Sequence, residues 1–507
     1  MTTASQATHH QSLLLTKQQQ ENNTRQKRIW DLLRHLPTFT FRFLRLLSFV
    51  FFLLPAFIVF LYHYFACDRI AVYYGVKKDD AAMIREKNNG ERMFLSRHYL
   101  DMYGSRTPCV NDNNEAKKKK KKKPVVIFVT GGAWIIGYRM WGCLLARALV
   151  PFGILVIMPD YRNFPKVNIK GMVDDVDMSI QWVLDHVEEY GGDRERVVLV
   201  GQSAGAHIGG VVVAKKVLDW IQQQQQQQRG ERSIEEDCRH LKSTYSPQQL
   251  CGFVTTSSPH NLVTMRSVFH RHGLSASVQR SIFGGRTGSN DDDLMDDITK
   301  SISTSDDIDV FEEWSPYHLV KKCQTEYISL ISEGSTKRSS RSSNNHSNND
   351  IIVQLKDIFP NLCVIHGTSD KTVPVEEAIE FLSLLSNLQI PALSKMYPGW
   401  SHTDPILEKP MLGNHTYHRD VYELVRRWTD SSGVVSDDDG FAFCNDNIER
   451  FNSEHKSESA ETIEIVGDSS KQVEDNSNLI PFDESHRILR PICPTTLVEI
   501  ARVCNPF

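Results

Sequence analysis

The sequence lacks the patterns that mark disulfide frameworks, metal sites and nucleic-acid binding. Its ten cysteines are scattered over 507 residues without a Cys-x-x-Cys pair, which argues against a disulfide scaffold and a structural zinc site. A His-Glu-x-x-His motif and carboxylate clusters with ligand spacing are also missing, so we expect neither a metal nor another cofactor. Positive and negative charges nearly balance at a net charge of −4, so no nucleic-acid partner is expected.

One long apolar run stands out near the N-terminus. Residues 46–66 (LLSFVFFLLPAFIVFLYHYFA) carry no charge and have the length of about 20 residues that a membrane-spanning helix needs. Because no small-residue cleavage site follows, we interpret the run as a retained membrane anchor in contact with lipid, not as a signal peptide. Basic residues before it favour a cytosolic N-terminus, whereas Pro55 is compatible with a re-entrant element, so the topology stays open.

Strand-like and helix-like segments alternate after this run. The strand-like segments are residues 97–103, 124–130, 154–161, 197–201, 252–258, 361–367 and 393–397. Helical patterns lie between several of them, and residues 260–320 have the irregular character of a lid. Such alternation predicts an α/β fold, with a mostly parallel sheet flanked by helices, over residues 90–430.

Polar tracts of biased composition flank and interrupt this pattern. We expect a disordered N-terminal tail at residues 1–28 and an acidic disordered segment at residues 431–485. Disordered insertions are expected near residues 109–123, 222–249 and 335–350, which hold lysine, glutamine and Ser/Asn runs. The lysine run is expected to be a solvated loop, with contact to anionic lipid as the alternative. The amphipathic C-terminal segment, residues 488–507, is expected to dock on the domain.

The motif that carries chemistry is a G-x-S-x-G at residues 201–205. It follows an apolar strand directly and precedes a helix of small residues, which is the arrangement of a nucleophile elbow. The tight turn lifts the hydroxyl of Ser203 off the sheet edge and aims the N-terminus of the helix at it. Ser203 is therefore the predicted nucleophile.

A serine hydroxyl needs a base, and the chain order of this arrangement is serine, acid, histidine. Asp370 follows the strand 361–367, and His402 follows the next strand, so both fall at strand ends. Asp404 is an alternative acid, although a separation of two residues rarely brings a carboxylate to the far nitrogen of the imidazole. His366 is an alternative base, but it precedes Asp370 and so breaks the order.

An oxyanion hole requires backbone N–H groups that point to the developing negative charge. Gly131, Gly132 and Ala133 follow an early strand, where a loop of this kind belongs, and glycine lets the backbone approach a substrate closely. Ala204, directly after the nucleophile, is expected to supply another N–H group. An ordinary glycine turn is the alternative for residues 131–134.

Together these residues resemble a known family. The motifs TGGAWIIGY (130–138), DYRNFP (160–165), GGDRERVVLVGQSAGAH (191–207), HGTSDKTVP (366–374) and SHTDPIL (401–407) are similar to those of isoprenylcysteine methylesterases, which are α/β-hydrolases. Thr130 departs from the histidine of the wider esterase group. SSPHNL (257–262) departs from the glycine-richer segment expected there.

The resemblance implies an activity and a place in the cell. It implies a serine esterase that hydrolyses the methyl ester of a prenylated C-terminal cysteine, free or on a protein, to a carboxylate and methanol. It also implies residence in endoplasmic reticulum and Golgi membranes. The triad roles map onto Ser203, Asp370 and His402, and the substrate-contacting backbone maps onto Gly131, Gly132, Ala133, Gln202, Ser203 and Ala204. Trp134 and Trp141 are either part of an apolar channel or ordinary core.

Two other functions stay open. One is a general membrane-anchored carboxylesterase or lipase with a luminal active site, which glycosylation at Asn345 or Asn414 would favour. The other is a catalytically silent hydrolase fold that serves as a binding protein. A silent protein usually lacks a member of the triad, and all three are present here.

Overall fold

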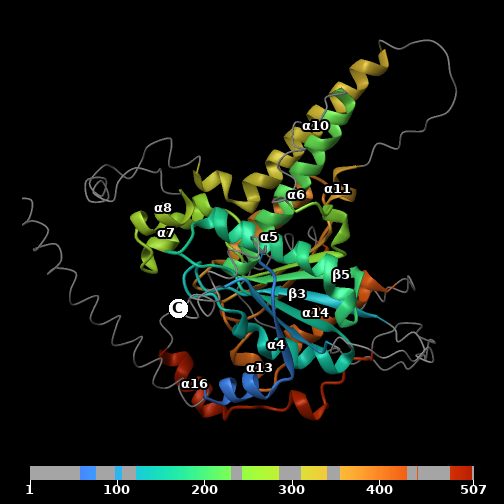
Figure 1. Cartoon of the computed structure of the whole chain (residues 1–507). Helices are drawn as coiled ribbons and strands as arrows, with labels where there is room; N and C mark the ends of the chain where they lie inside the picture. Colours follow the sequence, from blue (N-terminus) through green and yellow to red (C-terminus); the bar gives the residue numbers. More distant parts are fainter. Residues whose placement is uncertain are drawn as a thin grey trace, which may run out of the picture. The chain divides into compact units, whose positions relative to one another are not determined.

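The computed structural model describes residues 58–75, 97–105, 122–229, 243–284, 310–339, 354–430, 442–443 and 480–504 (Figure 1). The chain divides into two compact units, His63–Pro491 and a second that combines Met1–Tyr62 with Ile492–Phe507. The first unit contains the predicted α/β domain. It extends beyond the predicted bounds of 90–430, because a first strand at residues 69–73 pairs with the strand at residues 99–103.

One mostly parallel sheet forms the centre of this unit. In the described residues its strand order is β1-β2-β4-β3-β5-β6-β7-β8-β9. Strands β3 to β8 run parallel, whereas β1, β2 and β9 pair antiparallel with their neighbours. The strands are β1 (Arg69–Tyr73), β2 (Tyr99–Tyr103), β3 (Lys123–Val129), β4 (Leu155–Pro159), β5 (Gly192–Gln202), β6 (Gly252–Thr256), β7 (Asn361–Gly367), β8 (Ala392–Tyr397) and β9 (Ala442–Phe443). This is the fold class predicted from the alternating pattern.

Helices cover both faces of the sheet. Figure 1 shows α4 and α14 on one face and α5 and α6 on the other. Because each face is covered, strands β4 and β6 are buried at every residue, which explains their unbroken apolar or small character. The helices are α4 (Cys143–Leu149), α5 (Ile169–His186), α6 (Ala204–Arg229), α7 (Leu262–Arg271), α8 (Ala276–Phe283), α10 (Pro316–Ser339), α11 (Leu355–Ile358), α12 (Val375–Asn387), α13 (Glu408–Met411), α14 (Thr416–Thr429) and α16 (Thr495–Cys504). The 3₁₀ turns are η1 (Arg139–Gly142), η2 (Val150–Phe152), η3 (Val187–Tyr190), η5 (Pro247–Gln249) and η8 (Arg487–Leu489).

The glutamine run is helical, so the prediction of a disordered insertion at residues 222–249 is wrong over part of that range. Helix α6 continues through the run to Arg229 and lies beside α10 (Figure 1). Gln225 is buried between them, and its Nε2 donates a hydrogen bond to the carbonyl oxygen of Glu326 at 3.2 Å. Glutamine has a high helix propensity, and a second helix was available to cover one side of the run. Residues 243–249 are also ordered, and residues 230–242 lie outside the described residues.

Three other predicted disordered segments need smaller corrections. Lys123 opens β3, residues 335–339 complete α10, and β9 lies within the acidic segment 431–485. Near the end of that segment, the ring of Phe482 packs 4.5 Å from the ring of Phe152. Phe482 belongs to a short apolar run at the end of a tract that is polar on average, so a compositional average hides this contact. Residues 1–28, 109–121 and 340–350 lie outside the described residues, as do 431–441 and 444–479.

The predicted anchor is only partly described. Residues 46–57 lie outside the described residues, and residues 58–66 are helical. Within the described parts of the chain, no helix combines the length and the apolar character needed to cross a membrane. In the C-terminal segment, Leu489 of η8 is buried, and its carbonyl oxygen accepts a hydrogen bond from Nε2 of His415 at 2.9 Å. Helix α16 belongs to the second unit.

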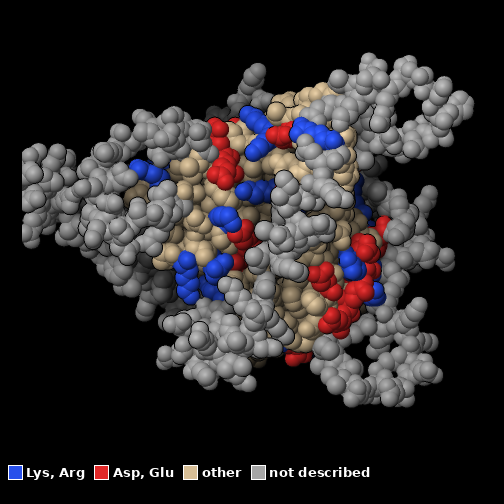
Figure 2. All heavy atoms as spheres, turned by 45° about the horizontal axis from the view of Figure 1, so that its top comes forward, with Lys and Arg blue, Asp and Glu red and all other residues tan. Residues whose placement is uncertain are grey.

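The described surface carries charges of both signs. Figure 2 shows Lys and Arg side chains interspersed with Asp and Glu side chains on one face. Large apolar side chains that are strongly exposed include Ile136 (66%) and Ile328 (55%). Ile136 follows the predicted oxyanion loop, and its backbone N–H donates to the carbonyl oxygen of Gly132 at 2.9 Å.

Candidate active site

The turn between β5 and α6 presents Ser203. Its φ of 53° lies in the left-handed region, which costs a non-glycine residue about 1–3 kcal/mol and is typical of functional sites. The backbone N–H of Ser203 donates to the carbonyl oxygen of Thr256 at 2.8 Å, which fixes the turn to the neighbouring strand. A side chain at Gly205 would collide with the carbonyl oxygen of Val129, so glycine is required for the helix to approach the sheet.

The three predicted triad residues meet at the carboxyl ends of β5, β7 and β8. The Nε2 atom of His402 lies 2.8 Å from Oγ of Ser203. Its Nδ1 atom lies 2.7 Å from Oδ2 of Asp370. The structure therefore joins residues that are far apart in the sequence into one chain of hydrogen bonds, in the geometry of a nucleophile, a base and an orienting acid.

The carboxyl group of Asp370 is held in its ionised form. Burial raises its pKa, but the hydrogen bond and charge of His402, together with backbone donors, outweigh burial and leave the pKa below its usual value. Its Oδ1 atom accepts the backbone N–H groups of Thr372 and Val373, each at 2.9 Å. An ionised Asp370 keeps the proton of His402 on Nδ1, so Nε2 is free to accept the hydroxyl proton.

The two alternatives for the triad occupy other positions. Asp404 accepts hydrogen bonds from the backbone N–H and the hydroxyl of Ser401, at 2.7 and 3.0 Å, while Asp370 faces the imidazole of His402. His366 is fully buried behind Asp370, with its Nε2 2.8 Å from the carbonyl oxygen of Val373 and 3.5 Å from Oδ2 of Asp370. It supports the acid, a role that the sequence did not suggest.

The predicted oxyanion loop lies against the nucleophile. A Cβ atom at Gly131 would fall 2.8 Å from Cβ of Ser203, so only glycine permits this approach. Ala133 and Trp134 have φ values of 49° and 62°, a strained left-handed pair. Of the predicted oxyanion residues, Gly131 therefore lies directly against Ser203, and Ala204 follows Ser203 in the chain.

The side chain of Gln202 holds the site together. Its Nε2 atom donates to the backbone carbonyl of His402 at 3.3 Å. Its Oε1 atom lies where a side chain at Gly131 would otherwise be. Gln202 was predicted as a backbone contact for substrate, and the structure adds a side chain that joins the loops of the oxyanion residues and the base.

A buried ionic network anchors the far end of the oxyanion loop. Asp160, at the end of β4, contacts Nη2 of Arg97 at 2.5 Å and Nη1 of Arg139 at 3.1 Å. Burial outweighs both guanidinium groups and raises the pKa of Asp160 to about 6. Nδ2 of Asn163 donates to the carbonyl oxygen of Gly137 at 2.8 Å. The DYRNFP motif (160–165) therefore holds the end of the oxyanion loop through the carbonyl oxygen of Gly137.

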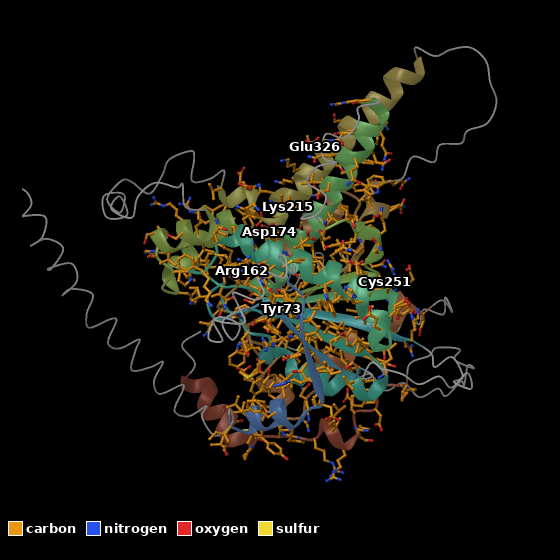
Figure 3. All side chains as sticks on the ribbon, in the orientation of Figure 1. Tyr73, Arg162, Asp174, Lys215, Cys251 and Glu326 are labelled. Atoms are coloured by element: carbon orange, nitrogen blue, oxygen red, sulfur yellow. The ribbon has the colours of Figure 1, made fainter. Side chains whose placement is uncertain are left out.

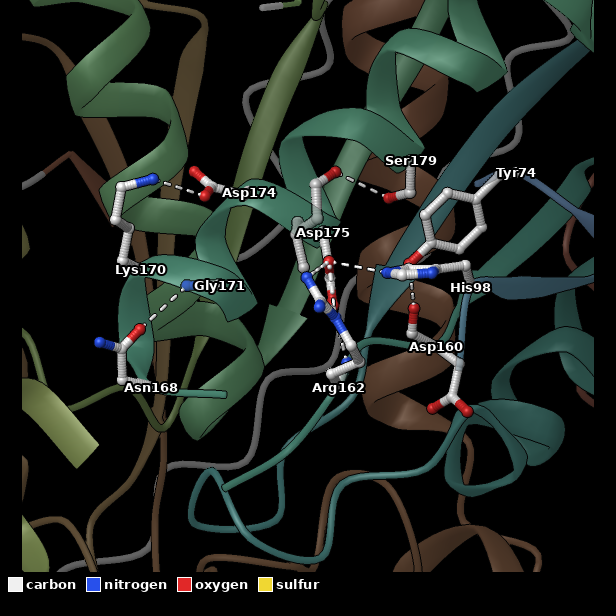
Figure 4. A network of polar contacts seen from close by, with 11 residues as sticks. Tyr74, His98, Asp160, Arg162, Asn168, Lys170, Gly171, Asp174, Asp175 and Ser179 are labelled. Carbon is white, nitrogen blue, oxygen red and sulfur yellow. Dashed lines mark hydrogen bonds and ion pairs between the residues drawn. The ribbon is translucent and has the colours of Figure 1, made fainter. Parts of the chain in front are cut away.

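A second part of this network fixes the motif to α5. Figure 4 shows Asp175 between His98 and Arg162. Oδ1 of Asp175 lies 2.9 Å from Nε2 of His98 and 2.7 Å from Nη2 of Arg162. Burial raises the pKa of Asp175, but its hydrogen bonds to His98 and Arg162 outweigh burial and lower it. The ionised carboxylate thereby ties residues 160–165 to the helical layer.

Comparison with known proteins places the chain in a family. A family model described as BD-FAE matches residues 112–303, and that of the prolyl oligopeptidase family matches residues 313–432. A probable isoprenylcysteine alpha-carbonyl methylesterase of Oryza sativa subsp. japonica is 31% identical over 73% of this chain and 66% of its own length. The isoprenylcysteine alpha-carbonyl methylesterase of Arabidopsis thaliana is 28% identical over 61% of this chain and 57% of its own length.

Solved structures that are similar to this chain include an inhibited esterase B from Lactobacillus rhamnosis. It has 13% identity and a TM-score of 0.44, and the match covers 81% of this chain and 99% of the other. The chain spans about half to two thirds of the length of the curated relatives it matches. The strand order, the serine at the end of β5 and the relatives at about 30% identity agree with one another. The chain therefore belongs to the α/β-hydrolases, and its curated relatives include isoprenylcysteine methylesterases, the family that its motifs resemble.

Proposed function

We propose that the chain is a serine esterase that hydrolyses the methyl ester of a prenylated cysteine. The single observation that carries the esterase chemistry is the hydrogen-bond chain from Asp370 through His402 to Ser203, at 2.7 and 2.8 Å. The class of substrate is supported by the names of the curated relatives.

Acylation follows from this geometry. Nε2 of His402 takes the proton of Ser203 as Oγ attacks the ester carbonyl, and Asp370 stabilises the resulting imidazolium. The negative charge on the carbonyl oxygen is stabilised by backbone N–H groups of the oxyanion loop and of Ala204. His402 then returns the proton to the methoxide oxygen, so methanol leaves and an acyl-serine remains.

Deacylation repeats these steps with water as the nucleophile. His402 removes a proton from the water, the oxyanion forms again, and Oγ of Ser203 leaves with the proton from His402. The prenylated cysteine departs with a free carboxylate. Ser203 is 9% exposed, so little of the nucleophile is open to bulk water.

The proposal is tested with detergent-solubilised protein and two esters, farnesylcysteine methyl ester and a short-chain aryl ester. We expect a much higher kcat/KM for the prenylated ester, and loss of both activities in Ser203→Ala but not in Ser281→Ala, an exposed serine on α8. Cleavage of the aryl ester alone would assign a general carboxylesterase. Folded protein that cleaves neither ester would favour a silent binding protein.

We also propose that the enzyme resides in endoplasmic reticulum and Golgi membranes, held by the apolar run at residues 46–66. A prenyl chain partitions into the bilayer, so an anchored enzyme meets its substrate at high local concentration. Alkaline carbonate extraction of cell membranes tests the anchor, and imaging of a fluorescent fusion tests the compartment. Full-length protein in the carbonate supernatant would contradict the anchor.

A further inference from the structure

His207 is a buried imidazole that the proposed mechanism does not use. It lies one turn after the nucleophile on α6, where its backbone N–H donates to the carbonyl oxygen of Ser203 at 2.9 Å. Its side chain is fully buried, and both ring nitrogens have partners. Nε2 lies 2.8 Å from the carbonyl oxygen of Trp314, and Nδ1 lies 3.3 Å from the indole Nε1 of Trp134.

These two partners select one form of the imidazole. A carbonyl oxygen only accepts hydrogen bonds, so Nε2 of His207 carries the proton. An indole N–H only donates, so Nδ1 carries the lone pair. A second proton on Nδ1 would face the indole N–H of Trp134. Burial lowers the pKa of His207 to about 3, so the imidazole keeps this neutral form at any working pH.

The first partner belongs to the oxyanion loop. Trp134 follows Ala133 in the strained left-handed pair, and its indole is 2% exposed. The indole also packs edge-to-face on Phe269 of α7 and Phe283 of α8, with ring centroids 5.4 and 5.0 Å apart. An indole held on several sides fixes the orientation of the peptide groups next to it.

The second partner belongs to the segment that enters α10. The Nζ atom of Lys215 on α6, labelled in Figure 3, lies over the ring of Trp314, 3.8 Å from the ring centroid. The next residue, Ser315, accepts the backbone N–H of Leu262 at 2.9 Å, which connects this segment to the start of α7. The imidazole of His207 on α6 therefore contacts both the oxyanion loop, through Trp134, and the segment that enters α10, through Trp314.

We propose that His207 and Trp134 form a positioning pair that holds the oxyanion loop beside Ser203. The carbonyl oxygen of Trp314 fixes the imidazole at its other ring nitrogen. The proposal rests on the proposed esterase function. The pair contacts no reacting atom. It acts by holding the N–H groups of residues 132 and 133 where the oxyanion forms.

Three conservative variants separate the contacts. Trp134→Phe keeps an aromatic ring but removes the indole donor together with part of the ring volume, so its Tm is compared with that of the other variants. His207→Asn keeps an acceptor near the position of Nδ1, whereas His207→Gln keeps a donor near the position of Nε2. Trp182→Phe is a matched control, because Trp182 lies 4.9 Å from His186 in another tryptophan–histidine contact, on α5 and away from the loop.

Two measurements distinguish a role in positioning the oxyanion loop from a role in the stability of the fold alone. The first is kcat per active site, counted by titration with a fluorophosphonate. The second is the inhibition constant of a trifluoromethyl ketone, whose adduct places an oxyanion in the hole. We expect Trp134→Phe and His207→Gln each to lower kcat about tenfold and to weaken the ketone equally, because small misplacements of stabilising groups are costly. KM should stay within twofold.

His207→Asn should retain more activity than His207→Gln, because it keeps the acceptor for Trp134. The double variant Trp134→Phe with His207→Gln should be no worse than either single variant, since the pair acts as a unit. Unchanged kcat and ketone inhibition in all variants, with a lower Tm alone, would overturn the inference. Wild-type protein inactive on both esters would instead overturn the proposed function.

Discussion

Gln202 and His402 are joined by a hydrogen bond from a side-chain amide to a backbone carbonyl, 3.3 Å long. The bond connects the residue before the nucleophile to the residue that activates it. Because Gln202 also lies against Gly131, this one side chain contacts both the loop of the base and the oxyanion loop beside the nucleophile.

Gln202→Met is therefore expected to impair chemistry more than folding. Methionine has a similar length but donates no hydrogen bond, so the loop that carries His402 gains freedom. We expect kcat to fall about tenfold, with a change in Tm of only a few degrees. Steady-state kinetics with titrated active sites measure this. Gln222→Met, at an exposed position on α6, is the matched control, and an equal loss in both variants would contradict the role of Gln202.

Asp370→Asn tests the choice of acid. The amide would present an N–H group to Nδ1 of His402 and force the wrong tautomer, so kcat should fall by about 10⁴. The backbone contacts of Oδ1 can persist, so the protein should stay folded. Asp404→Asn should have a much smaller effect, because Asp404 binds Ser401. An enzyme that survives Asp370→Asn and fails with Asp404→Asn would reverse the assignment.

Glu377 predicts a pH dependence of stability. Burial raises its pKa to about 7, although it accepts hydrogen bonds from the backbone N–H of Asn261 and the hydroxyl of Thr264. The ordinary value is 4.5, so the folded protein binds more protons than the unfolded chain between these values. Stability from this group is therefore fully present below pH 4.5 and is lost as the pH rises through 7.

Glu377→Gln keeps an acceptor for Asn261 and removes the ionisation. Between pH 5.5 and 8.5, the free energy of unfolding in urea should decline by about 2 kcal/mol more in wild type than in the variant. Asp160, whose pKa is also raised, adds its own decline to both proteins. Glu376→Gln, at an exposed neighbouring position on α12, should keep the wild-type dependence. Parallel pH profiles for wild type and Glu377→Gln would show that this carboxyl group does not set the slope.

The glutamine run gives a prediction about folding. Gln225→Glu would replace the donor that binds the carbonyl oxygen of Glu326 with a carboxylate, leaving two acceptors face to face at a buried site. The free energy of unfolding should fall by about 1–3 kcal/mol. Gln223→Glu changes the same residue type at an exposed position of α6 and should change it by less than about 0.5 kcal/mol. Urea midpoints that match in the two variants would contradict the packing of α6 on α10.

Much of the fold and of the site could be predicted because they follow local rules. The strands before Ser203 and Asp370 were visible as short apolar runs, and the order of serine, acid and histidine needs no distance information. His207 and His366 could not be recognised in the same way. Each stands four residues from a member of the triad, but that spacing does not reveal its role. Their importance comes from contacts in space, with a tryptophan on another loop for His207 and with the carboxyl group of Asp370 for His366.

The helical glutamine run shows what composition alone cannot predict. Composition marks it as low-complexity, and a compositional rule cannot tell whether another helix covers one side of it. The packing partner, α10, lies about a hundred residues further along the chain, with Gln225 and Glu326 separated by 101 positions. Apolar contacts at Phe482 were hidden for the same reason.

The final prediction concerns recognition of the prenyl chain. Ile136 follows the oxyanion loop, bonds through its backbone N–H to Gly132, and is 66% exposed, so an apolar side chain faces solvent at the end of this loop. If a prenyl chain lies on it, Ile136→Asp should raise KM for farnesylcysteine methyl ester about tenfold, since burying such a side chain contributes about 1.5–3 kcal/mol. KM for a short aryl ester should not change, because that substrate has no prenyl chain to lie on Ile136.

Ile328→Asp is the matched control, since Ile328 is 55% exposed on α10. It should leave both substrates unaffected. Equal increases in KM for the two esters after Ile136→Asp would indicate damage to the oxyanion loop, not lost prenyl contact. An unchanged KM for both would place the prenyl chain elsewhere.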